Sequence, residues 1–90
     1  MLLATTVTLS EPTLIAVGQG NSETEHKVYI KVASGVTDVV IGGQSDACEF
    51  PLSASDSPFC VELQYQEELW ADGTGDITIL EYHLSKTPDL

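Results

Sequence analysis

Hydrophobic and polar positions alternate with a period of two along most of this chain. In residues 3–9, the side chains of Leu3, Thr5, Val7 and Leu9 fall on one side, and small or polar ones fall on the other. This period is typical of half-buried β-strands. No segment of useful length shows the 3.6-residue period of an amphipathic helix. Alternation or short apolar runs predict further strands at residues 14–17, 27–32, 36–41, 60–66 and 77–84.

The alternation also predicts which side chains face the core. Residues 27–32 place three aliphatic side chains on one face and two lysines with Tyr29 on the other. The lysine-bearing face is either a local docking patch or a solvated surface. Farther along, Val61, Leu63 and Tyr65 are expected to point inward, because they alternate with polar residues.

Glycine and proline punctuate the segments. Ser34-Gly35 is expected to close a hairpin between the strands on either side of it. Gly42-Gly43 is expected to end a strand, and Asp72-Gly73-Thr74-Gly75-Asp76 to form a turn before the last strand. Phe50-Pro51-Leu52 is expected to be a short edge strand or a turn, because proline donates no hydrogen bond to a central ladder.

This spacing predicts an all-β fold, a single small β-sandwich or barrel of about seven short, mostly antiparallel strands. We expect residues 1–10 to form an N-terminal strand or arm, residues 11–84 the β-sandwich domain, and residues 85–90 a C-terminal tail.

The last strand is apolar on both faces, which is unusual for so small a domain. Such a strand is either central to a closed structure or covered by another subunit. Trp70 is expected to anchor the core, with a place in a subunit interface as the next alternative. Residues 3–9 are the natural segment for pairing with a neighbouring subunit. The candidate interface residues are therefore Leu3, Thr5, Val7, Leu9, Tyr29, Trp70, Leu80, Tyr82 and Leu84.

The charge of the chain is strongly negative. Fourteen acidic residues stand against three lysines, without any arginine, and give a formal net charge of −11. Such a body repels nucleic acid and anionic membranes, and it lacks the side chain that reads phosphates in a bidentate manner. We therefore expect no nucleic-acid or membrane partner. An acidic surface fits solubility, docking onto a basic partner, or both.

Two cysteines, Cys48 and Cys60, are too few for a disulfide framework and fit no zinc-binding spacing. Free thiols are the simpler expectation, although one bridge between them stays open. Residues 1–12 lack the positive charge and the apolar length of a signal peptide, and no apolar run is long enough to span a bilayer. These features favour a protein made in a cytoplasm.

No motif predicts catalysis or cofactor binding. The carboxylates of Asp72, Asp76 and residues 67–68 lack the spacing of a calcium loop. His26 and His83 are expected to be isolated strand-face histidines, without partners. We therefore predict no catalytic, cofactor-binding or metal-binding residues, and no enzyme.

An ordered series of short motifs occupies residues 39–82: Val40-Ile41-Gly42-Gly43, Phe50-Pro51-Leu52, Val61-Glu62-Leu63, Leu69-Trp70-Ala71 and Ile79-Leu80-Glu81. This series resembles a small β-domain that recurs in virion proteins of tailed bacteriophages. Two positions depart from that pattern: Glu49 replaces a usual glycine, and Ser55-Asp56 replaces a Gly-Glu turn.

The resemblance implies a structural virion component, most simply a capsid decoration (cement) protein that binds the outer surface of the shell and stabilises it. Its implied partner is the major capsid protein, and its implied state is a homo-oligomer, typically a homotrimer. The implied location is the capsid exterior, after assembly in the host cytoplasm. Two alternatives stay open: a neck or tail structural subunit, and a carbohydrate-binding β-module on a phage fibre.

Overall fold

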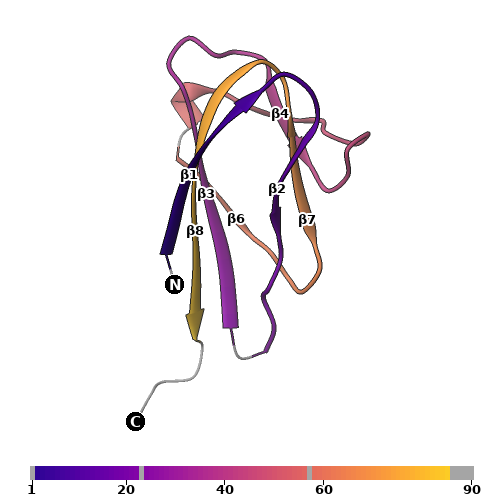
Figure 1. The fold of residues 1–90 in the computed structure, drawn as a ribbon, viewed down its shortest axis with the longest axis vertical. Helices are drawn as coiled ribbons and strands as arrows, with labels where there is room; N and C mark the ends of the chain where they lie inside the picture. Colours follow the sequence, from indigo (N-terminus) through magenta and orange to yellow (C-terminus); the bar gives the residue numbers. More distant parts are fainter. Residues whose placement is uncertain (1, 23, 57, 86–90) are drawn as a thin grey trace.

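The computed structural model describes residues 2–22, 24–56 and 58–85, with only the backbone of Leu84 and Ser85 described. Eight strands form two antiparallel four-stranded sheets that pack face to face as a β-sandwich (Figure 1). The first sheet has the order β1 (Leu2–Leu9), β8 (Gly75–Ser85), β3 (Thr24–Val32) and β6 (Phe59–Glu62). The second has the order β2 (Thr13–Val17), β7 (Glu68–Asp72), β4 (Val39–Gly42) and β5 (Phe50–Leu52). The predicted all-β sandwich is confirmed.

The core lies between the two sheets and comes from alternate positions of nearly every strand. In β3, Val28, Ile30 and Val32 are buried as predicted. Within the same sheet, Ile30 pairs with Ile79 of β8 and Val32 pairs with Ile77. A strand exposes its side chains on opposite faces in turn, so the intervening positions of β3 and β8 lie on the outside of the sheet. The buried hydrophobic residues are Leu9, Ala16, Val28, Ile30, Val32, Val39, Ile41, Leu52, Leu63, Leu69, Ala71, Ile77 and Ile79.

The hairpin predicted at Ser34-Gly35 is wrong. The chain does turn there, with Gly35 at a φ of 88° and the amide of Val36 donating to the carbonyl of Ala33. However, β3 and β4 belong to different sheets, so the turn carries the chain from one layer to the other. The Asp72–Asp76 turn does the same between β7 and β8. A sandwich core needs such crossings, and a local turn signal does not distinguish them from hairpins.

Two predicted core residues are not in the core. The strand predicted to reach residue 66 ends at Glu62, and Tyr65 beyond it is 63% exposed. Trp70 lies on the outer face of β7, half-buried, where its indole Nε1 donates to Glu68 Oε1 at 2.9 Å. Its neighbours Leu69 and Ala71 supply the core contacts instead, because they point to the opposite face.

Proline and glycine act near β5 as predicted. Phe50–Leu52 is an edge strand that pairs only with β4. Gly42 ends β4, and a side chain there would collide with the carbonyl oxygen of Ala47. Ser55-Asp56 lies in one 3-10 turn, Ala54–Asp56, in which Asp56 Oδ2 accepts from the amide of Ser53 at 3.1 Å.

The N-terminal strand is part of the sandwich. All eight residues of β1 pair antiparallel with β8, from Leu2 opposite Tyr82 to Leu9 opposite Gly75. Figure 1 shows β8 running between β1 and β3. Both edges of β8 are therefore paired within this chain. On its inner face Ile77 and Ile79 are buried, whereas Glu81 and His83 farther along are half-buried.

Candidate functional site

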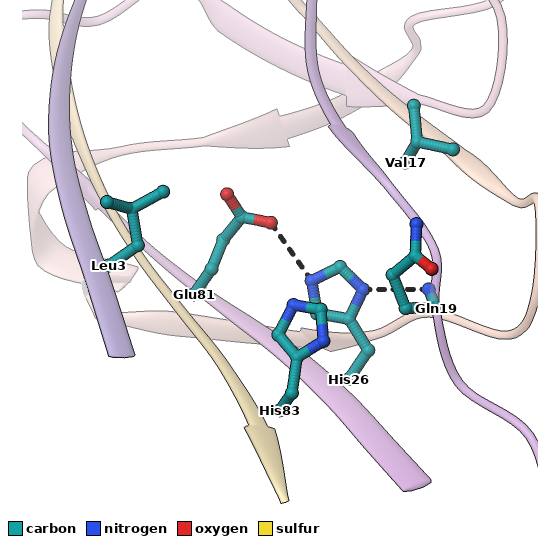
Figure 2. A pocket seen from close by; sticks show the side chains of 6 residues that line it. All are labelled: Leu3, Val17, Gln19, His26, Glu81 and His83. Carbon is teal, nitrogen blue, oxygen red and sulfur yellow. Dashed lines mark hydrogen bonds and ion pairs between the residues drawn. The ribbon is translucent and has the colours of Figure 1, made fainter. Parts of the chain in front are cut away.

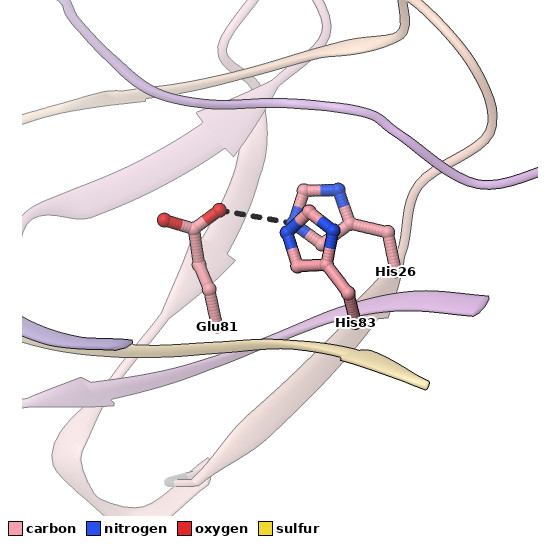
Figure 3. Close-up of side chains that lie close together, drawn as sticks. All are labelled: His26, Glu81 and His83. Carbon is pink, nitrogen blue, oxygen red and sulfur yellow. Dashed lines mark hydrogen bonds and ion pairs between the residues drawn. The ribbon is translucent and has the colours of Figure 1, made fainter. Parts of the chain in front are cut away.

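Three polar side chains gather at one open end of the sandwich: His26 of β3, and Glu81 and His83 of β8. The pairing of the two strands places His26 opposite His83, and Val28 opposite Glu81, so all three side chains lie on the inner face. The two imidazole rings stack with their centroids 4.3 Å apart (Figure 3). The hypothesis of isolated histidines is therefore wrong.

The sequence carried a signal for this cluster. His26 continues the inward positions of Val28 and Ile30 by one step of two, and Glu81 and His83 continue those of Ile77 and Ile79 in the same way. When polar residues continue the inward positions of a strand beyond its buried aliphatic residues, they are expected to hydrogen-bond to each other or to the backbone at the edge of the core.

The side chain of His26 is only 1% exposed, and both of its ring nitrogens have hydrogen-bond partners. The backbone amide of Gln19 donates to Nδ1 at 3.0 Å, and Nε2 lies 2.9 Å from Glu81 Oε1 (Figure 2). Because an amide can only donate, Nδ1 must be the acceptor, and the ring hydrogen is on Nε2. The His26–Glu81 contact is thus a hydrogen bond from a neutral imidazole to a carboxylate.

The position of the Gln19 amide is itself fixed by the preceding glycine. The amide of Gly18 donates to the carbonyl of Glu67 at 2.6 Å, and the carbonyl of Gly18 accepts from Gln66 at 2.9 Å. A chain of contacts therefore links the 63–67 segment to Gly18, then to Gln19, His26 and Glu81. It ties the β2–β3 and β6–β7 connections to the two central strands of the first sheet.

This geometry argues against a metal centre at the cluster. The ligating atoms of His26, Glu81 and His83 all lie within 4.8 Å of one another, and two imidazoles with one carboxylate are a known metal-binding set. However, a metal on Nε2 of His26 would require the hydrogen on Nδ1, where it would point at the Gln19 N–H. His26 therefore serves as a structural residue, and two remaining donors do not make a metal centre.

The same argument removes His26 as a general base. A base needs a free ring nitrogen within reach of the proton it takes, and both nitrogens of His26 are occupied by Gln19 and Glu81. A cavity of about 310 Å³ opens beside the cluster, with Leu3, Val17 and Gln19 on its other sides (Figure 2). Of the polar side chains that line it, His26 and Glu81 bond to each other, and His26 also accepts from the Gln19 backbone.

His83 gives the cluster a pH dependence. Burial lowers the pKa of His83 below its ordinary value of 6.5, against the opposing effect of the Glu81 charge. The folded state therefore favours the neutral ring, and the unfolded chain takes up a proton first as the pH falls through 6.5. The free energy of unfolding therefore decreases as the pH falls below 6.5.

We expect the free energy of unfolding to fall more steeply in the wild type than in His83→Gln as the pH is lowered through 6.5. Urea unfolding at a series of pH values measures the free energy of unfolding of both proteins. Subtracting the two profiles removes the contribution of the fourteen acidic residues that both proteins share. Parallel profiles would contradict the prediction.

A second surface covers the outer face of the first sheet. Tyr29 and Tyr82 stack there with centroids 5.8 Å apart, beside Leu80. An apolar hollow of about 300 Å³ adjoins them, lined by Tyr29, Lys31, Pro58, Thr78 and Leu80. From here on, the outer sheet face means the outward positions of these strands: Leu2, Ala4, Thr6, Thr8, Glu25, Lys27, Tyr29, Lys31, Cys60, Glu62, Asp76, Thr78, Leu80 and Tyr82.

The outer sheet face is nearly neutral in a strongly acidic molecule. It holds Lys27 and Lys31 against three acidic residues, whereas the whole chain carries −11. Contacts with the hydroxyl of Tyr82 and with Cys60 raise the pKa of Tyr29 from 10 to about 12. An apolar, nearly neutral face of this kind is suited to contact with another protein.

The other predicted interface residues are distributed elsewhere. Leu9 is fully buried, so its side chain serves this chain and not a partner, whereas Val7 packs against the core and stays half-buried. Leu3 and Thr5 lie on the inner side of β1 but are exposed. Trp70 is on the outer face of the second sheet, and the side chain of Leu84 lies outside the described residues.

The carboxylates of Glu67, Glu68, Asp72 and Asp76, which lack calcium-loop spacing in the sequence, each accept a local hydrogen bond. Asp72 accepts from the amide of Gly73, Asp76 from the hydroxyl of Thr8, Glu67 from the amide of Gln64, and Glu68 from Trp70. Asp72 and Asp76 flank the turn between β7 and β8, whereas Glu67 and Glu68 lie at the start of β7, and the four form no common group among the described residues. Both cysteines are free thiols, with Cys60 on the outer sheet face and Cys48 bonded to the carbonyl of Gln44.

Within the described ranges, no helix has the length and apolar character needed to cross a membrane. Comparison with protein-family models, with curated proteins and with solved structures gave no match to this chain.

Proposed function

We propose that this chain is a structural virion protein, a capsid decoration (cement) protein that docks on the outer surface of a phage shell through its outer sheet face. The observation that carries the proposal is the pairing of an apolar, nearly neutral face with an otherwise acidic body. The partner is the major capsid protein, and the decorating unit is a homo-oligomer.

The outer sheet face has the composition of a protein interface. Interface centres are enriched in aromatic residues and depleted in charge, with polar groups around them. Tyr29, Leu80 and Tyr82 form such a centre, and the lysines of β3 lie beside it. The hollow next to Tyr29 is large enough to accept a side chain from a partner.

The placement of the family-like motifs also supports a structural role. Val40–Gly43 and Phe50–Leu52 lie at β4 and β5, Leu69–Ala71 in β7 and Ile79–Glu81 in β8. In each motif, residues such as Leu52, Leu69 and Ile79 fill the core. The −11 charge favours an outward location, because packaged DNA would repel this body.

Leu80→Glu is expected to weaken binding to undecorated shells by roughly tenfold or more. Burying a leucine side chain is worth about 1.5–3 kcal/mol, and about 1.4 kcal/mol corresponds to a factor of ten. Titration of the labelled protein onto shells of the major capsid protein encoded in the same genome measures the affinity.

The matched control is Leu14→Glu, which makes the same change on the outer face of the second sheet, where Leu14 is 40% exposed beside Trp70. Its binding should equal that of the wild type. Equal loss in both variants, or binding to a glycan array that depends on Trp70 or Tyr29, would contradict the proposal. Counting copies per virion separates a shell protein, present in many copies, from a neck or tail subunit, present in a small multiple of six.

A further inference from the structure

The free edge of β1 differs from the three other sheet edges of this fold. Edge strands expose unpaired N–H and C=O groups, and proteins usually protect them by short length, proline, bulges or charge. β5 has three residues with Pro51 in the middle, β2 has five with a shift in register between Leu14 and Ala16, and β6 has four and ends on Glu62. Each of these edges carries a protective feature.

The β1 edge carries none of these features. Its eight residues, Leu2–Leu9, pair with β8 without any register shift, and they include no charged residue and no proline. Leu2 is 67% exposed and Leu3 is 52% exposed. A long, regular, uncharged edge with exposed leucines is a surface prepared for strand addition.

We propose that this edge pairs with β1 of a second copy of the chain, in antiparallel orientation, and joins two first sheets into one continuous sheet. This inference rests on the proposed function, because it describes how the decorating unit assembles. It predicts a two-fold dimer in place of the trimer that the family resemblance implies.

The absence of charge on β1 argues for a second copy as the occupant. A partner strand with lysines or carboxylates would find no opposite charges along β1. A second copy of β1 has no charged residue and therefore needs none. An antiparallel pair of identical strands is self-complementary, since a two-fold axis repeats every contact. The strand is neutral in a chain of −11, so pairing sets no like charges directly opposite each other.

Exposure selects the register. With Thr5 opposite Thr5 of the second copy, Leu3 faces Val7 on the inner side and Ala4 faces Thr6 on the outer side. A register shifted by one pair would set Leu3 against Leu9, which is buried in its own core. Leu3 and Thr5 are exposed, so the second sheet leaves this half of β1 open to a neighbour.

The dimer would extend the proposed docking surface. Leu2 and Ala4 lie on the same outer face as Leu80 and Tyr82, so pairing two β1 strands makes that face continuous across both copies. One dimer then presents two docking faces to a shell, and its binding gains from avidity.

The test is sedimentation equilibrium of the whole chain over a dilution series, at about 0.15 M salt, where charges are screened beyond about 8 Å. The wild type should reach twice the 9.6 kDa mass of one chain. Thr5→Lys and Thr5→Glu should each weaken the dimer by roughly tenfold or more, because both copies bring the same charge to the two-fold axis. An equal mixture of the two variants should restore the dimer.

Thr74→Lys is the matched control, since it adds the same charge at an exposed turn between β7 and β8 and should leave the dimer unchanged. Far-UV circular dichroism checks that each variant is folded. A wild type that stays monomeric, one that forms a trimer, or a mixture that fails to re-form a dimer would overturn the inference.

These results separate the inference from the proposed function. Leu80→Glu should keep the dimer and lose shell binding, whereas Thr5→Lys should bind the shell more weakly, as a monomer. A monomeric wild type that still decorates shells through Leu80 would overturn the dimer and leave the decoration proposal standing.

Discussion

Replacing His26 with leucine is expected to lower the free energy of unfolding by about 3 kcal/mol, a large part of the roughly 5–15 kcal/mol that stabilises a domain. Leucine fills much of the space of the ring but offers no polar atom. The amide of Gln19 then loses its acceptor, and Glu81 loses its donor. An amide left unsatisfied in a buried site costs about 1–3 kcal/mol, less at the part-buried Gln19, and a hydrogen bond to a charged group contributes about 1.5–3 kcal/mol.

Thermal and urea unfolding measure the loss, and a fall of about 3 kcal/mol corresponds to roughly 12–24 °C in Tm for a domain of this size. Glu81→Leu supplies the control, because removing both partners of a buried hydrogen bond is less harmful than removing one. The double variant should therefore lose less than the two single variants together. Additive losses would show that His26 and Glu81 act independently, against the geometry described here.

Alternation was sufficient to predict much of the fold. In β3 it placed Val28, Ile30 and Val32 in the core, which the structure confirms, and proline limited residues 50–52 to a short edge strand or a turn, of which the structure has the edge strand. These features depend on a single strand and on local backbone chemistry, which the sequence states directly. The same local reasoning identified the half of the last strand that faces outward as a partner surface, which stays a prediction.

Features that depend on two distant segments were beyond that reasoning. Ser34-Gly35 has the composition of a hairpin turn, yet the decision to cross between sheets depends on which strands β3 and β4 find as neighbours. The wrong prediction that Trp70 lies in the core has the same cause. Alternation within β7 allowed either Trp70 or the Leu69 and Ala71 pair to face inward, and the small Ala71 fits the crowded interior opposite Ile41.

The His26 cluster shows a third case. Each histidine could be assigned to the inner face from its parity, but their contact requires the antiparallel register that sets residue 26 against residue 83. The acceptor role of Nδ1 requires, in addition, the path of the loop through Gly18 and Gln19. Side-chain chemistry at this site is therefore a consequence of tertiary structure.

Gly18→Ala is expected to destabilise the protein by about 3 kcal/mol, with a comparable fall in Tm of roughly 12–24 °C. A Cβ atom at this position would collide with the carbonyl oxygen of Gln64 and would stand 3.0 Å from the Cβ of Leu63. The backbone cannot give way easily, because Gly18 is hydrogen-bonded on both sides, to Glu67 and to Gln66. Overpacking against fixed backbone is one of the few mechanisms by which a single methyl group has so large an effect.

Gly43→Ala is the matched control, since its added methyl would meet only the carbonyl oxygen of Glu68, at an ordinary 3.8 Å, and should change stability by no more than about 0.5 kcal/mol. Hydrogen exchange at the amide of Gln19 gives a second measure. That amide is protected by His26 in the wild type and should exchange faster in Gly18→Ala, because displacing Gly18 withdraws the donor from Nδ1. Equal stability of the two alanine variants would mean that the loop does not pack on residues 63–67, and the tautomer assigned to His26 would lose its structural basis.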